Sequence, residues 1–213
     1  MKERPILFSA PMVRALLAGT KTQTRRAAKV ESTLGIDSIL APRRAGGHAA
    51  TYLLPEQAAE AAVCCPYGQP GDRLWVREAW AETRLFQASG TGMVVYREGD
   101  NRTDYGGPWK PSIHMRRRDS RILLEITGVR LERLQDISEA DARAEGIECM
   151  ARDPECGYRN YLDKTSQDWT LSPRESFQSL WELINGPASW SANPWVWPLD
   201  LRRLLDQQQG QKQ

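Results

Sequence analysis

The chain has 213 residues, a formal net charge of +2, 40% hydrophobic residues, 16 glycines and 13 prolines. This composition suits one globular domain with many turns and excludes a chain too polar to build a core. The N-terminus lacks the long apolar stretch of a signal peptide, and no apolar run approaches the roughly 18 residues of a membrane span. We therefore expect a soluble, cytoplasmic protein with no membrane partner.

Charge is unevenly distributed along the chain. Residues 1–44 contain nine Lys or Arg and three Asp or Glu, residues 110–133 contain seven and three, and residues 134–200 contain five and twelve. Two basic segments and one acidic segment favour one side that faces a polyanion and an opposite acidic side. A mosaic of solvated charges explains the same counts, and the sequence leaves both interpretations open.

The cysteines and histidines show no metal-binding pattern. They are Cys64, Cys65, Cys149, Cys156, His48 and His114. No two cysteines have the CxxC spacing of a zinc site, and neither histidine is close to a cysteine in sequence. We expect reduced thiols, no metal and no other cofactor.

The first part of the chain predicts a strand, a short helix and a second strand. Residues 4–9, RPILFS, have the length and apolar character of a strand. A helix is expected over residues 11–19, because a proline begins this segment and a glycine ends it. Residues 21–26, KTQTRR, favour a strand with alternating threonines. Residues 27–54 show no period and suggest a long loop, and residues 55–63 are a candidate helix.

The remainder predicts further strands and two capped helices. In the first helix, over 137–147, Ser138 is the expected N-cap, with Asp141 three residues later. The second, over 172–186, carries Phe177, Leu180, Trp181 and Ile184 on one face. Strands are expected over 73–80, 93–98, 121–134 and 193–201, and a loop over 148–171.

Two residues mark irregular strand positions. Gly128 suggests a bulge or bend in the strand over 121–134. Pro198 argues that the last strand lies at a sheet edge or carries a bulge, because proline donates no backbone hydrogen bond. Together the elements predict the α+β class, as a small mixed or antiparallel β-barrel with decorating helices and long loop insertions.

Four segments in order resemble the ASCH domain family, whose fold is PUA-like. They are GTKTQTRR after the first helix, GDRLWV opening a strand, EITGVRLERL, and ISEADARAEGI. The whole chain is similar to the larger ASCH proteins of phages and prophages. The resemblance implies a single domain over 1–204, with insertions at about 27–70, 84–112 and 148–171, and a disordered polar tail over 205–213.

The resemblance also implies a function. ASCH proteins bind RNA or nucleosides in a cleft beside the first helix of an open β-barrel. Gly19, Lys21 and Arg26 fit the family motif, but Thr24 stands where most members have Glu. This departure resembles a subgroup that hydrolyses N4-acetylcytidine to cytidine and acetate. The catalytic positions implied by the subgroup are Lys21, Thr24 and Glu145.

These residue types can perform amide hydrolysis. A Thr hydroxyl is a poor nucleophile that needs an adjacent base, and a Lys can serve if burial or nearby cations lower its pKa. Arg25 and Arg26 could supply that positive field, and Glu145 could hold Lys21 or protonate the leaving amine. Lys21 and Thr24 are three residues apart, so on a straight strand they would face opposite sides. The hypothesis therefore requires Lys21 to lie in the turn after Gly19.

Other residues suggest RNA contacts. Arg116, Arg117 and Arg118 form the clearest candidate phosphate-binding cluster, although an exposed, solubilising turn has the same composition. Trp109, in a loop beside a lysine, is the best candidate for stacking on a base, whereas most other tryptophans suit the core.

The leading hypothesis is a nucleoside-binding or RNA-binding ASCH protein that hydrolyses the N4-acyl group of an acylated cytidine. The expected partner is a modified cytidine nucleoside or RNA. Two alternatives remain open: a non-catalytic RNA-binding or regulatory module, and a ribonuclease that uses the same cleft with Lys21 as base.

Overall fold

The computed structural model describes residues 1–28, 65–82, 94–99, 108–149, 157–163 and 168–204, together with the backbone of three strands within 40–63. In this part of the chain the helices are α1 (Ala10–Ala18), α2 (Glu139–Ala144) and α3 (Pro173–Asn185), with 3-10 turns η4 (Ser112–His114), η5 (Arg117–Asp119) and η6 (Leu134–Asp136). The strands are β1 (Glu3–Leu7), β2 (Gln23–Ala27), β3 (Leu40–Arg44), β4 (Ala50–Leu53), β5 (Glu60–Val63), β6 (Arg73–Arg77), β7 (Trp80–Glu82), β8 (Val94–Tyr96), β9 (Leu123–Val129), β10 (Glu132–Arg133), β11 (Tyr158–Arg159), β12 (Trp169–Thr170) and β13 (Trp195–Leu204). The protein is therefore α+β, as the sequence predicts.

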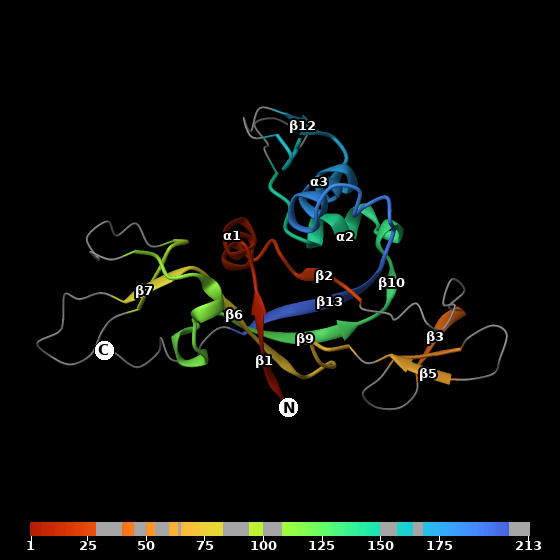
Figure 1. Ribbon diagram of the computed structural model, residues 1–213, viewed down its shortest axis with the longest axis horizontal. Coiled ribbons are helices and arrows are strands. Elements are labelled where there is room, and N and C mark those ends of the chain that lie inside the picture. The colour runs from red at the N-terminus through yellow and green to blue at the C-terminus, as the bar shows by residue number, and fades with distance from the viewer. Residues whose placement is uncertain are drawn as a thin grey trace, which may run out of the picture.

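A six-stranded sheet forms the centre of the fold. Its order is β1-β6-β9-β13-β10, with β2 also paired to β13. β1 runs parallel to β6, and the other pairings in this sheet are antiparallel. Among the described strands no pairing joins β1 to β2, so the sheet is not closed into a barrel (Figure 1). The predicted mostly antiparallel sheet is confirmed, whereas closure of that sheet into a barrel is not.

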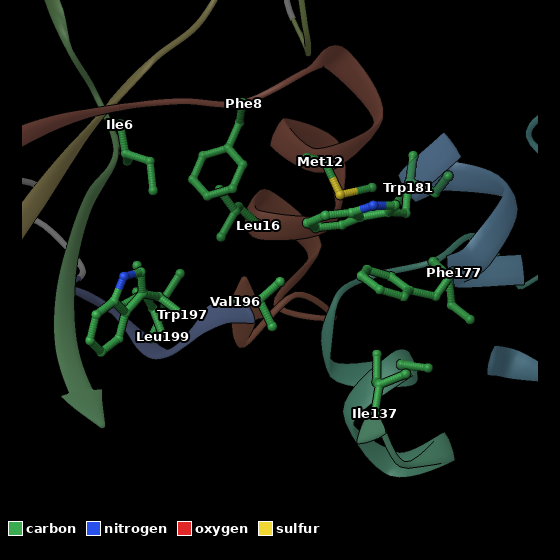
Figure 2. Close-up of a cluster of buried hydrophobic side chains, with 14 of the residues drawn as sticks. Ile6, Phe8, Met12, Leu16, Ile137, Phe177, Trp181, Val196, Trp197 and Leu199 are labelled. Carbon is green, nitrogen blue, oxygen red and sulfur yellow. The ribbon is translucent and has the colours of Figure 1, made fainter. Parts of the chain in front are cut away.

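The three helices lie together on one side of this sheet (Figure 1). Their apolar faces meet side chains from β1, β9 and β13 in one buried cluster. Figure 2 shows Met12 of α1 beside Phe177 and Trp181 of α3, with Val196 and Leu199 of β13 on the sheet side. None of the helices in the described segments is long and apolar enough to cross a membrane.

Local sequence explains where the helices begin and end. Gly19 has a φ of +77°, a left-handed conformation that favours glycine, and its N–H donates back to Leu16 of α1. Ser138 caps α2, because its Oγ accepts a hydrogen bond of 3.1 Å from the backbone N–H of Asp141. Ser172 caps α3 in the same way. These helix predictions are confirmed.

β13 is an internal strand, so an edge position for Pro198 was the wrong alternative. β13 pairs with β2 on one side and with β9 and β10 on the other. Proline donates no backbone hydrogen bond, but Pro198 lies between Val196, which pairs with β10, and Leu199, which pairs with β9. At this gap between two partner strands the missing N–H is tolerated. The expected irregularity near Gly128 is confirmed, since the β9–β13 register shifts between Asp200 and Leu201.

Four expectations were wrong, three for peripheral segments and one for a cysteine. The loop predicted over 27–54 and the helix considered over 55–63 contain β3, β4 and β5, which form a separate antiparallel sheet. The loop predicted over 148–171 contains the strand pair β11–β12. Cys149 is disulfide-bonded rather than reduced. The strands were missed because their pairing is not accompanied by a clear alternation of apolar residues. The tail over 205–213 lies outside the described residues.

Asp72 holds the N-terminus of the chain against the start of β6. Its Oδ1 accepts a hydrogen bond of 2.7 Å from the backbone N–H of Lys2, and its Oδ2 pairs with Arg4 Nη1 at 3.0 Å. The Lys2 N–H is the main cause that lowers the pKa of Asp72 below its ordinary value of 3.8. The ionised carboxylate therefore stabilises the parallel β1–β6 pairing.

We predict that Asp72→Asn lowers the free energy of unfolding at neutral pH. Because the pKa of Asp72 is lower in the folded protein, its stabilising contribution is present above the ordinary pKa and is lost as pH falls through the folded pKa. The difference between wild type and variant should therefore shrink in acid. Urea denaturation at several pH values measures it, and a difference that stays constant from neutral pH into acid would contradict the prediction.

Candidate functional site

Lys21 lies in the turn between α1 and β2, not in the strand. The backbone N–H groups of Thr20 and Lys21 both donate to the carbonyl oxygen of Ala15, at 3.0 and 3.2 Å, and β2 begins only at Gln23. The alternation of a straight strand therefore does not apply to Lys21 and Thr24. Both residues line the same cavity.

The Lys21 ammonium is buried and surrounded by acceptors. Its Nζ donates to the carbonyl oxygen of Gln23 at 2.8 Å, to the carbonyl oxygen of Glu145 at 2.6 Å and to Glu145 Oε2 at 2.9 Å. Burial lowers the pKa of Lys21, and the Glu145 carboxylate opposes this shift. The fold thus brings together Lys21 and Glu145, which are 124 residues apart in sequence.

Arg25 is the second buried cation of the site. Its side chain is fully excluded from solvent, and Nη1 lies 3.2 Å from Glu145 Oε1. Nη1 also donates to the side-chain oxygen of Gln23, and Nη2 lies 2.6 Å from Glu132 Oε1 and 3.4 Å from Asp141 Oδ2. Glu145 therefore compensates two buried cations, one on each carboxylate oxygen.

Polar side chains continue this cluster across the sheet. Gln23 Nε2 donates to Asp141 Oδ1 at 3.1 Å and to Asp200 Oδ1 at 2.7 Å. Arg130 joins Asp200 to Glu132, with contacts of 3.0 and 3.1 Å. Gln23, Glu132, Arg130 and Asp200 were not predicted as site residues. They have no distinctive spacing in sequence, because β2, β10 and β13 become neighbours only in the folded sheet.

The cavity has a volume of about 370 Å³, within the usual range for small-molecule sites. One wall is polar and the other is aromatic and aliphatic, with Met12, Phe177 and Trp181 shown in Figure 2. Ile184 also lines it and is 58% exposed, so the four residues predicted on one face of α3 do face the same cavity. The full lining is Leu7, Phe8, Ser9, Met12, Lys21, Thr24, Arg25, Arg26, Ala27, Ser112, Glu145, Phe177, Leu180, Trp181, Ile184 and Asn185.

Thr24 contributes a hydroxyl to this lining. Residue Thr24 is 4% exposed, yet its hydroxyl makes no hydrogen bond to any residue in the described ranges. In particular, Lys21 donates to Gln23 and Glu145 and not to Thr24. The cavity therefore presents a threonine hydroxyl that has no hydrogen-bond partner among the described residues.

Arg26 lies beside Thr24 with part of its hydrogen-bonding capacity unused. Its Nη2 donates to the carbonyl oxygen of Leu7 at 2.6 Å, and its guanidinium lies 5.1 Å from the centroid of the Phe8 ring. The buried Nε has no hydrogen-bond partner among the described residues. Burial lowers the pKa of Arg26, while the charges of Tyr67 and Glu145 oppose this shift.

The other predicted RNA-binding residues do not line the cavity. Arg116 pairs with Asp119 at 2.6 Å and with Glu82 at 2.8 Å, and Arg117 pairs with Glu3 at 2.7 Å. Arg118 is 72% exposed in its side chain. Arg116 to Arg118 follow η4, whose Ser112 does line the cavity, and Trp109 is only partly buried.

Gly146 sets how closely the end of α2 approaches Lys21. It has a φ of +78°, and a Cβ at this position would lie 2.7 Å from Lys21 Cβ and 2.8 Å from Ala15 Cβ. The sequence indicates Gly146 only as a helix terminator. The structure shows that the absence of a side chain at residue 146 is also required, because a Cβ there would push α2 away from the α1–β2 turn.

Within the described ranges, no group of three or more His, Cys, Asp or Glu side chains is arranged to hold a metal ion.

Comparison of this chain with known proteins gives no match. No family model, curated protein or solved structure matches it.

We predict that Gly146→Ala destabilises the protein more than Gly19→Ala. Both glycines have positive φ, which costs an alanine about 1 to 2 kcal/mol. Only Gly146 adds a clash, since no atom lies within 4 Å of a Cβ at Gly19. Thermal or urea unfolding of the two variants measures the difference. Equal destabilisation would show that α2 does not depend on close approach to Lys21.

Proposed function

We propose that this protein binds a cytidine-type nucleoside in the cavity and hydrolyses the amide of an N4-acylated cytosine, with Thr24 as nucleophile. The observation that carries the proposal is that Lys21, Thr24 and Glu145 line one cavity, in which no residue of the described ranges bonds the Thr24 hydroxyl. The ASCH resemblance, with its PUA-like barrel and a cytoplasmic location, belongs to the same proposal.

The cavity supports a planar, polar substrate. Its volume of about 370 Å³ suits a ligand of nucleoside size. Phe8, Phe177 and Trp181 offer aromatic surface for a base. The opposite wall carries cationic donors and a hydroxyl, which match the carbonyl oxygens of cytosine and of its acyl group.

The proposed chemistry begins with a proton shift inside the buried pair. Transfer from Lys21 Nζ to Glu145 Oε2, across 2.9 Å, gives a neutral amine and a carboxylic acid. Lys21 then takes the Thr24 proton as Oγ1 attacks the acyl carbon. Glu145 protonates the leaving 4-amino group, and cytidine departs from an acyl-threonine. Glu145 then takes a proton from water as the water oxygen attacks the ester, and returns it to Thr24 Oγ1 as the carboxylic acid leaves.

Arg26 is the proposed stabiliser of the oxyanion. The acyl oxygen gains negative charge when Thr24 attacks, and a positioned cation in a buried site stabilises that charge. Arg25 is less suited to this role, because its terminal nitrogens already contact Gln23, Glu132, Asp141 and Glu145. Within the described ranges the Arg26 side chain makes one hydrogen bond, to Leu7, so its other donors could bind substrate.

A second candidate is nucleoside or RNA binding without hydrolysis. The three acceptors around Lys21 Nζ match the three hydrogens of an ammonium, and so favour the protonated form that cannot act as a base. This candidate predicts binding of cytidine or RNA that depends on Arg26 and is indifferent to removal of the Thr24 hydroxyl.

We predict that the wild-type protein releases cytidine from N4-acetylcytidine, and that Lys21→Met and Thr24→Val lower kcat/KM by about a thousandfold. Thr24→Ser should retain measurable activity because it keeps the hydroxyl. Arg118→Ala is the matched control, since this exposed cation lies outside the cavity. Chromatographic detection of cytidine measures the rates. Absence of turnover, or equal rates in wild type and Thr24→Val, would exclude the hydrolase proposal.

We further predict that kcat/KM rises with pH below the ordinary lysine pKa of 10.5. Burial lowers the pKa of Lys21, so the neutral amine forms at a lower pH than in a free lysine, and activity should rise as this form accumulates. Lys21→Arg should be inactive across the range because guanidinium stays protonated. A kcat/KM that falls as pH rises towards 10.5, while the protein stays folded, would contradict the role of Lys21 as the base.

A further inference from the structure

α3 presents two different faces. Phe177, Leu180 and Trp181 line the cavity described above, whereas Glu175, Gln178 and Glu182 border an open groove of about 700 Å³. These two sets lie on opposite sides of a helix with 3.6 residues per turn. The groove is therefore separate from the candidate active site and is formed by the outer face of α3 with β12 and its flanking residues.

The groove carries exposed apolar side chains. Leu162, Trp169 and Leu171 border it and are 50%, 57% and 61% exposed. The Trp169 ring rests on the backbone of Gly157, where a Cβ would lie 2.7 Å from its Cε3. An exposed tryptophan held in place by packing is the kind of residue that anchors protein interfaces.

The same groove holds carboxylates that lack cations. Asp168, Glu175 and Glu182 border it, and none of them forms an ion pair within the described ranges. Asp168 accepts a hydrogen bond of 2.7 Å from the Asn160 amide, and Glu175 accepts one from the Thr170 hydroxyl, so two of these acids are positioned but not neutralised. Most other described carboxylates are paired: Glu3, Asp72, Glu78, Glu82, Glu98, Asp119, Glu125, Glu132, Glu139, Asp141, Glu145, Glu148 and Asp200.

We propose that this groove docks a cationic, amphipathic peptide segment of another protein. Its Lys or Arg side chains pair with Asp168, Glu175 and Glu182, and its apolar side chains pack on Trp169 and the two leucines. The charge complementarity selects this occupant. Nucleic acid and anionic lipid surfaces carry negative charge and are repelled by the three carboxylates. A purely apolar segment would leave those carboxylates desolvated and unpaired.

The test titrates full-length protein into a fluorescently labelled synthetic peptide that alternates Arg with Leu, and follows anisotropy. A peptide that alternates Arg with Ser has the same charge and no apolar side chains. We expect the Arg-Leu peptide to bind more tightly and to weaken as salt rises. Trp169→Ala, and separately Glu175→Gln combined with Glu182→Gln, should each weaken binding about tenfold.

Asp136→Asn is the matched control variant. Asp136 is an exposed acid with no ion pair in the described segments, and it does not border the groove, so its loss should leave the affinity unchanged. Circular dichroism checks that each variant is folded. Absence of binding, equal binding of the two peptides, or equal affinity of the groove variants and wild type overturns the proposal. So does a dimer in sedimentation that Trp169→Ala dissociates, because a second copy then fills the groove.

Discussion

The candidate site depends on the ion pairs of the Glu145 carboxylate with Lys21 and Arg25. The carboxylate compensates Lys21 at 2.9 Å and Arg25 at 3.2 Å, and both cations are buried. A buried charge that loses its partner costs several kcal/mol, about 3 to 5 in measured cases. Glu145 lies at the end of α2, whereas Lys21 lies in the α1–β2 turn and Arg25 in β2. This carboxylate therefore joins α2 to the sheet. Gly146 allows the close approach that the ion pairs require.

The contacts that stabilise this cluster also limit the proposed chemistry. Burial disfavours the Lys21 ammonium, but three oxygen acceptors around Nζ favour it. The two effects oppose each other at a single nitrogen. The Lys21 and Glu145 side chains are already only 1% and 4% exposed, so contacts within the protein, rather than displaced solvent, set this balance.

The sequence predicts the local features of this site better than its long-range ones. α1 and α2 follow from their caps, and the glycine after α1 explains why Lys21 and Thr24 share a cavity. Nothing local indicates that Phe177 and Trp181 form the opposite wall, because their helical spacing is equally typical of a core face. Two acidic partners of Arg25, Glu145 at the end of α2 and Glu132 of β10, lie over 100 residues away in sequence. Such pairings depend on the register of the sheet, which no single segment encodes.

Charge illustrates the same limit in another way. Residues 134–200 hold an excess of acidic residues, which the sequence presents as one negative segment. Among the described acids of this segment, two groups differ in their pairing. Asp141, Glu145 and Asp200 form ion pairs with Arg25 and Arg130. Asp168 and Glu182 form no ion pair within the described ranges and lie beside exposed apolar side chains. The charge available to a partner is therefore set by ion pairing in the folded protein and not by the count along the chain.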